Sequence, residues 1–111
     1  MEEERRRAPR YPFVATAEVI PDSSRAVIPV RVTEISLYGC YVEMPDALEE
    51  RAKMKIKIQA EGRFFESQAT VIYSEPKQGM GICFQNLNPH YHAVLKRWLL
   101  EAARAKFGKQ G

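Results

Sequence analysis

Hydrophobic and polar residues alternate through much of the first 85 positions, a pattern that predicts strands. The clearest example is residues 53–60, where Met54, Ile56 and Ile58 alternate with lysines and a glutamine. One face of such a strand is buried and the other faces water. Other β-type segments bounded by turn residues lie at 11–20, 26–36, 40–44, 63–75 and 80–84. Six short strands with hairpin-type turns predict a mainly β protein, an antiparallel barrel or sandwich.

Two strand details follow from the same pattern. Within residues 63–75, alternation places Ala69, Val71 and Tyr73 on one face of the strand. Within the second β-type segment, Pro29 lacks the N–H that a central strand needs, so it indicates a sheet edge or a bulge there.

After residue 87 the spacing of the apolar residues changes from that of a strand to that of a helix. Asn88 and Pro89 are typical of a helix N-cap followed by its first residue, and Gly108 is suited to end the helix. Apolar residues then recur with the spacing of an amphipathic helix: Tyr91, Val94, Leu95, Trp98, Leu99 and Ala102. We therefore expect a flexible arginine-rich arm over 1–10, a barrel over 11–87, and a helix over 88–107 packed on that barrel.

Length and composition narrow the class of protein. A chain of 111 residues that is 45% hydrophobic fits one globular domain. No apolar run approaches the roughly 18–20 residues of a membrane span, and the charged start, Met1 to Arg7, does not resemble a signal peptide. These features predict a cytoplasmic protein without a membrane span. With no attached output domain expected, it would act through a separate downstream protein partner, which the sequence does not identify.

The charge is more informative in its distribution than in its sum. The net charge of +3 is too mild to indicate a nucleic-acid partner. Residues 5–10 hold four arginines and no acidic residue, namely Arg5, Arg6, Arg7 and Arg10. The strands show no obvious exposed aromatic pair interleaved with basic residues, as a single-strand binding surface would. Nucleic-acid binding by a small barrel is therefore the weaker hypothesis.

The sequence offers little for catalysis. Cys40 and Cys83 have no second cysteine or histidine at metal-ligand spacing and are expected to be small buried apolar residues. His90 and His92, two residues apart, lie on different sides of the predicted helix. Phosphate-loop and dinucleotide motifs are missing as well. We expect a protein that is not an enzyme and that holds no metal or cofactor.

The first candidate motif is the pair Arg6 and Arg10, four residues apart in a segment that Pro9 keeps extended. The planar fork of an arginine matches phosphate oxygens, and it also matches the O6 and N7 acceptors of guanine. The pair therefore fits a ligand that carries both groups. A solvated basic tail is the alternative.

The second candidate motif lies where residues 26–36 end. Glu34 and Ser36 are two residues apart and share a face, while Ile35 points to the core. The Ser36 hydroxyl is available to a phosphate or a base edge, and a carboxylate at 34 can accept from guanine's N1–H and amino group. Gly39 permits positive φ and a close approach of the backbone to a ligand. An ordinary hairpin turn is the alternative.

Taken together, Arg6-x-x-x-Arg10 and Glu34-x-Ser36-x-x-Gly39 resemble the RxxxR and [D/N]xSxxG motifs of the PilZ domain family. The resemblance covers nearly the whole chain. It implies a six-stranded antiparallel PilZ-like β-barrel with a C-terminal α-helix. It also implies a ligand, cyclic di-GMP, because PilZ domains are bacterial receptors for this second messenger.

The resemblance further implies roles for the motif residues. Arg6 and Arg10 would grip guanine and phosphate, while Ser36 and Gly39 would form the surface against which the nucleotide lies. Arg5 and Arg7 would add contacts, which would suit a stacked, dimeric form of the ligand. Outside the motifs, Tyr73 is a candidate for stacking on a base, with a core or sheet-surface tyrosine as the alternative.

Glu34 departs from the family pattern, which has Asp or Asn there. Its extra methylene shifts the carboxylate, and hydrogen bonding is sensitive to such offsets. Glu34 either reaches guanine in a bent rotamer or pairs with Arg6 or Arg10 and competes with the ligand. The leading hypothesis is a single-domain cyclic di-GMP receptor. The alternative is a PilZ-like adaptor that binds no nucleotide and acts by protein–protein interaction.

Overall fold

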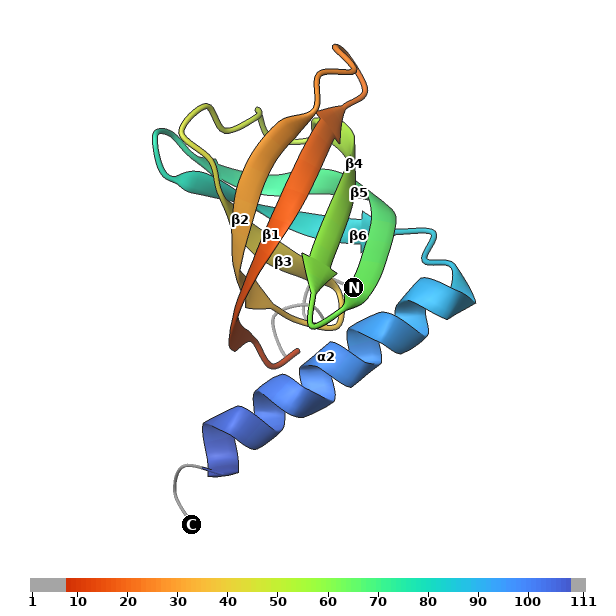
Figure 1. The fold of residues 1–111 in the computed structure, drawn as a ribbon. Helices are drawn as coiled ribbons and strands as arrows, with labels where there is room; N and C mark the ends of the chain where they lie inside the picture. Colours follow the sequence, from red (N-terminus) through yellow and green to blue (C-terminus); the bar gives the residue numbers. More distant parts are fainter. Residues whose placement is uncertain (1–7, 109–111) are drawn as a thin grey trace.

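The chain folds into a closed β-barrel covered at one end by a helix (Figure 1). The computed structural model describes residues 8–108. Its elements are β1 (Tyr11–Pro21), β2 (Ile28–Ile35), β3 (Gly39–Glu43), β4 (Lys53–Ala60), β5 (Arg63–Glu75), β6 (Gly79–Gln85) and α2 (Pro89–Gly108). All neighbouring strands are antiparallel, in the order β1-β2-β3-β6-β5-β4, with β4 closing on β1. The predicted fold class, a six-stranded antiparallel barrel with a C-terminal helix, is confirmed.

The barrel interior is filled by the inward positions of each strand. Met54, Ile56 and Ile58 of β4 are almost completely buried, as their alternation with polar residues predicts. Cys40 and Cys83 are also buried and carry free thiols, which confirms their expected role as small apolar residues. Burial raises the pKa of the Cys40 thiol, so this side chain stays protonated and unreactive at neutral pH.

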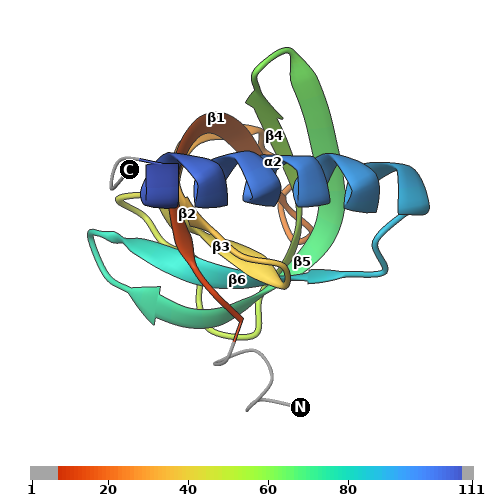
Figure 2. The same cartoon turned by 90° about the horizontal axis from the view of Figure 1, so that it is seen from below.

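Helix α2 crosses the open end of the barrel (Figure 2). It begins as predicted, because the Asn88 side chain accepts a hydrogen bond from the His90 N–H at 2.7 Å. Trp98 is fully buried, with its ring centroid 5.3 Å from that of Phe13 and 6.0 Å from that of Phe65. The helix therefore covers the apolar end of the barrel. Among the described residues, no helix is both long and apolar enough to cross a bilayer.

Two irregularities shape the sheet. The pairing of β2 with β3 begins at Arg31, so Pro29 lies where β2 pairs only with β1. This confirms the predicted edge. The expected orientation of Tyr73, by contrast, is wrong. A register shift between Val71 and Tyr73 adds one residue to β5 relative to β6, and such a bulge reverses the faces of the residues beyond it. Val71 is buried, whereas Tyr73 lies on the outer surface and is half-buried there.

Candidate binding site

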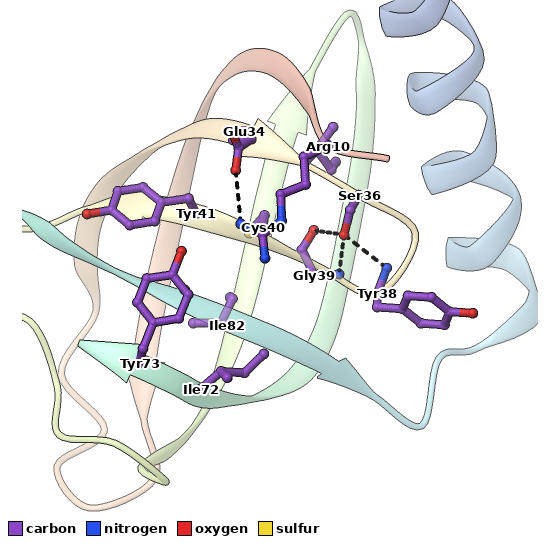
Figure 3. A pocket seen from close by; sticks show the side chains of 12 residues that line it. Arg10, Glu34, Ser36, Tyr38, Gly39, Cys40, Tyr41, Ile72, Tyr73 and Ile82 are labelled. Atoms are coloured by element: carbon purple, nitrogen blue, oxygen red, sulfur yellow. Dashed lines mark hydrogen bonds and ion pairs between the residues drawn. The ribbon is translucent and has the colours of Figure 1, made fainter. Parts of the chain in front are cut away.

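A concave surface lies on the outside of the barrel, over β2, β3, β6 and β5 and beside the residue that precedes β1 (Figure 3). Its free volume, including the part that opens to solvent, is about 420 Å³. The residues that line it are Arg10, Glu34, Ile35, Ser36, Tyr38, Gly39, Cys40, Tyr41, Ile72, Tyr73, Gly81 and Ile82. We refer to this surface as the outer pocket.

Four of the seven residues expected from the motifs meet at the outer pocket, namely Arg10, Glu34, Ser36 and Gly39, and the stacking candidate Tyr73 also lines it. The register of β1 with β2 explains this, because Tyr11 pairs with Ile35. Arg10, one residue before Tyr11, is thereby carried next to the turn that follows β2. The other three candidates, Arg5, Arg6 and Arg7, lie outside the described residues.

Arg10 and Glu34 form an ion pair at the edge of the pocket. The distance between Arg10 Nη1 and Glu34 Oε1 is 3.8 Å, and the two side chains are 54% and 44% exposed. Ion pairs this exposed contribute about 0.2–1 kcal/mol, so the contact is easily exchanged for a ligand. Of the pairings expected for Glu34, the one with Arg10 is therefore present in the free protein.

Ser36 holds the turn between β2 and β3. Its hydroxyl oxygen accepts hydrogen bonds from the N–H groups of Tyr38 at 3.3 Å and Gly39 at 3.2 Å, and it lies 3.3 Å from the Gly39 carbonyl oxygen, to which it donates. In addition, the Ser36 N–H donates to the Gly39 carbonyl at 2.9 Å. The hydroxyl expected to be available to a ligand is therefore occupied within the turn, and Ser36 first of all fixes the shape of the pocket.

Gly39 is required for a different reason from the one expected. It is not among the described residues with positive φ, so the left-handed conformation that a glycine permits is not used here. Gly39 pairs with Cys83 of β6, and a Cβ added at Gly39 would lie 1.9 Å from the Ile82 carbonyl oxygen. The missing side chain lets β3 and β6 approach each other and close the barrel beside the pocket.

The alternation around Glu34 is as predicted. Ile35 is completely buried, whereas Glu34 and Ser36, on either side of it, are partly exposed on the pocket side. Glu34 is the cross-strand partner of Tyr41 on β3. The carboxylate is thus placed between Arg10 and an aromatic side chain.

Tyr41 is the residue that sequence reasoning missed. It alternates outward between the buried residues Cys40 and Val42, and it lies next to Tyr73, with 6.2 Å between ring centroids (Figure 3). Burial and a hydrogen bond from its hydroxyl to Glu75 raise the pKa of Tyr41 to about 12, so it is a neutral hydrogen-bond donor at physiological pH. The alternation of Tyr41 within a short strand was the available signal.

The described residues show no arrangement that points to metal chemistry. Within residues 8–108, no group of three or more His, Cys, Asp or Glu side chains is placed to hold a metal ion. His90 and His92 lie in the first turn of α2, and neither lines the outer pocket. The arrangement at the pocket is suited to binding a polar, planar ligand through charge, hydrogen bonds and aromatic contact.

Comparison with known proteins identifies relatives of this architecture. The family model described as the PilZ domain matches residues 4–101. No curated protein sequence matches the chain. One similar structure is the PilZ domain with c-di-GMP of YcgR from Escherichia coli, with 17% identity, a TM-score of 0.77, and coverage of 96% of this chain and 97% of that one.

Two further structures share the fold. The inhibitor of motility MotI/DgrA of Bacillus subtilis has 19% identity and a TM-score of 0.75, over 96% of this chain and 54% of that one. The PilZ domain of CeSA from a cellulose-synthesizing bacterium has 19% identity and a TM-score of 0.62, over 93% and 99%. At these identities the structures establish the fold alone.

Proposed function

Because this chain belongs to the PilZ domain family, we propose that it is a receptor that binds cyclic di-GMP reversibly and signals to a separate protein partner. The observation that carries the proposal is the meeting of Arg10, Glu34, Ser36 and Gly39 at one outer pocket, although they come from two distant segments of the chain. The related structure of the YcgR domain with c-di-GMP supports the choice of ligand.

The chemistry of the pocket fits the parts of that nucleotide. Cyclic di-GMP carries two guanines and two phosphates, and the Arg10 guanidinium offers the donor geometry that suits either group. The Glu34 carboxylate accepts from the N1–H and amino group of guanine once Arg10 turns toward the ligand. The turn built by Ser36 supplies a fixed surface between them. These residues bind and orient the nucleotide, and the proposal includes no chemical change to it.

The N-terminal residues complete the proposal. Arg6 is expected to act with Arg10, with Arg5 and Arg7 adding contacts, so that the arm closes over the bound nucleotide and alters the surface that a partner protein recognises. These three arginines lie outside the described residues, and their roles rest on the sequence motif. The cytoplasmic location also stays a prediction.

The test is calorimetric titration of the protein and of Arg10→Ala with cyclic di-GMP. We expect one saturable binding process for the unaltered chain and a large loss of affinity for the variant. Lys57→Ala, on the distant strand β4, is the control for the loss of one positive charge and should bind as the unaltered chain does. Failure of the unaltered chain to bind at high micromolar nucleotide would exclude the receptor function.

A second candidate is an adaptor that binds no nucleotide. The Arg10–Glu34 ion pair favours it, since the arginine that a nucleotide needs already has a carboxylate partner. Thermal melting separates the two candidates. A ligand at 100 times its dissociation constant stabilises the folded state by about 2.7 kcal/mol. A melting temperature that does not move with cyclic di-GMP, together with retention of a partner protein, would support the adaptor.

A further inference from the structure

Helix α2 packs on the barrel with one side only. It lies across the end of the barrel, and its main packing contacts are with β5 and β1 (Figure 2). The buried side chains Val94, Leu95, Trp98 and Ala102 belong to the core that these strands share. The opposite side of α2 faces away from the barrel, and no other described element covers it.

A ridge of three exposed residues runs along this uncovered side. Lys96, Leu100 and Arg104 are spaced four residues apart, so their side chains follow one line on the helix. The ridge is about 12 Å long, from the rise of an α-helix. Leu100 at its centre is 55% exposed. The small side chains of Ala93 and Ala103 lie on the same side of the helix, so Leu100 protrudes between them.

The ridge carries positive charge that is not neutralised locally. Within residues 8–108, Lys96 and Arg104 form no ion pair. A third cation, Arg97, lies beside the ridge with its Nε 3.6 Å from Glu101 Oε2. Glu101 is the one acidic residue in the sequence of α2, and its carboxyl group also contacts Glu61 in the turn after β4, at the margin of this surface. We call Lys96, Arg97, Leu100 and Arg104 the outer face of α2.

Charge and shape together indicate what would cover the outer face. A second copy of the chain would bring like charges together, which opposes association. A helix that lies on a membrane needs a broad apolar stripe facing the lipid, but the apolar stripe of α2 is already packed on the barrel. Among the described side chains of α2, Leu100 is the only large apolar one that is exposed. One apolar residue between cations is complementary to carboxylates around a small apolar hollow.

We propose that the outer face of α2 docks a separate protein partner, which presents carboxylates around an apolar hollow that receives Leu100. The inference deepens the proposed function, since it rests on the assignment of a protein partner, and it applies equally to the adaptor that binds no nucleotide. Complementary charges accelerate encounter and fix the orientation of the two proteins. Burial of the leucine and of the arginines supplies the contacts at the centre.

The outer face ends close to the strand that follows Arg10. The Lys106 ammonium lies 5.6 Å from the centroid of the Tyr11 ring, and Tyr11 is the residue after Arg10 of the outer pocket. Lys106 is only two residues beyond Arg104, the last residue of the ridge. A partner on the outer face would therefore be seated at the end of the molecule where the nucleotide-binding arm joins β1.

The experiment uses a synthetic helical peptide with rows of glutamates on either side of an alanine stripe as the probe. Titrated into the isotopically labelled chain, it should change the amide shifts of Lys96, Leu100 and Arg104, with affinity that falls as salt is added. A neutral peptide with glutamine in place of each glutamate is the control. Equal binding of the neutral peptide, or shift changes centred outside α2, would overturn the inference.

Two double variants test the position of the charges. Lys96→Glu with Arg104→Glu reverses both cations of the ridge, and we expect at least about tenfold weaker peptide binding. Lys53→Glu with Lys77→Glu makes the same change in net charge outside α2, at two exposed positions, and should lose much less. Equal losses in the two double variants would mean that general charge attraction holds the peptide, and would overturn the docking face.

Leu100→Ala tests the apolar centre of the face. It keeps a good helix former at an exposed position, and we expect about three- to tenfold weaker peptide binding. Trp98 is the only tryptophan of the chain and is fully buried under α2, so its fluorescence verifies that the helix stays packed in each variant. Unchanged affinity in a variant with unchanged fluorescence would exclude a contact through Leu100.

Two further measurements separate this inference from its alternatives. Sedimentation of the chain with phosphatidylglycerol vesicles, without binding to the acidic peptide, would overturn the protein partner in favour of a membrane surface. Cyclic di-GMP titration of the Lys96→Glu, Arg104→Glu variant should match that of the unaltered chain. Failure of the unaltered chain to bind the nucleotide would overturn the receptor function and leave the docking face standing, whereas failure to bind the peptide would do the reverse.

Discussion

Arg10 and Glu34 contact each other at the edge of the outer pocket, with 3.8 Å between Nη1 and Oε1. The two residues lie 24 positions apart in the chain and are brought together by the pairing of β1 with β2. Their charges cancel locally. A ligand that needs the arginine must therefore compete with the glutamate.

Shortening Glu34 should therefore strengthen nucleotide binding. The carboxylate of Glu34→Asp is one methylene farther from Arg10, so the ion pair weakens while an acceptor for guanine remains. We expect affinity up to about fivefold higher, since an exposed ion pair contributes about 0.2–1 kcal/mol. Calorimetric titration measures the change. Glu34→Ala is the matched control, because it removes the acceptor as well and should not share the gain. Weaker binding by the aspartate variant would contradict the competition.

Replacing Ser36 should loosen the turn that shapes the pocket. In Ser36→Ala the N–H groups of Tyr38 and Gly39 lose their acceptor, and we expect a loss of about 1 kcal/mol in unfolding free energy. Ser36→Thr keeps the hydroxyl and should retain most of the stability. Chemical denaturation without ligand measures both. If the alanine variant were as stable as the unaltered chain, the hydroxyl would not be holding the turn.

A methyl group at Gly39 should oppose barrel closure. The added Cβ would meet the Ile82 carbonyl oxygen, which belongs to the backbone and cannot rotate away. We expect Gly39→Ala to cost at least about 3 kcal/mol of unfolding free energy. Gly62→Ala is the control: nothing lies within 4 Å of its added Cβ, but its φ of +73° is unfavourable for alanine, at a cost of about 1–2 kcal/mol. Comparable losses in the two variants would be inconsistent with the proposed strand contact.

The turn between β4 and β5 should give a small pH dependence. The pKa of Glu61 is raised above its ordinary value. The main cause is a hydrogen bond with Glu101 of α2, and the second is burial. Because the folded state holds this proton more tightly, the stabilisation is present below pH 4.5 and is lost as the pH rises through the folded-state pKa. Glu61→Gln should therefore melt at a slightly higher temperature than the unaltered chain at pH 7, with a smaller advantage at pH 4.

Glu66→Gln is the control for that measurement. Glu66 lies on the same hairpin but pairs with Lys55 at 3.5 Å, so removing its charge should give no gain in melting temperature at pH 7. A gain of the same size in both variants would indicate a general charge effect and not the Glu61–Glu101 contact.

Local pattern was sufficient for the strands and the helix, whereas the choice of a closed barrel over a sandwich came from the resemblance to the PilZ family. The alternation through Met54, Ile56 and Ile58 predicted β4 correctly, and the Asn88-Pro89 pair marked the start of α2. These elements depend on neighbours close in sequence, whose periodicity and capping preferences are visible without a structure.

The site was only partly predictable, because its details depend on contacts between distant strands. Simple alternation put Tyr73 on the same face as Ala69 and Val71, and only the bulge relative to β6 turns it outward. The requirement for Gly39 comes from Ile82, more than 40 residues later in the chain. Such contacts follow from barrel closure, which no local motif records.

The most direct test of the account is an amide chemical-shift titration of the isotopically labelled chain with cyclic di-GMP. The account predicts saturable changes at Ser36, Gly39 and Gly81 around the outer pocket, with little change at Lys55 and Lys57 on the far side of the barrel. An unchanged spectrum at high micromolar nucleotide, or changes centred on β4, would contradict it.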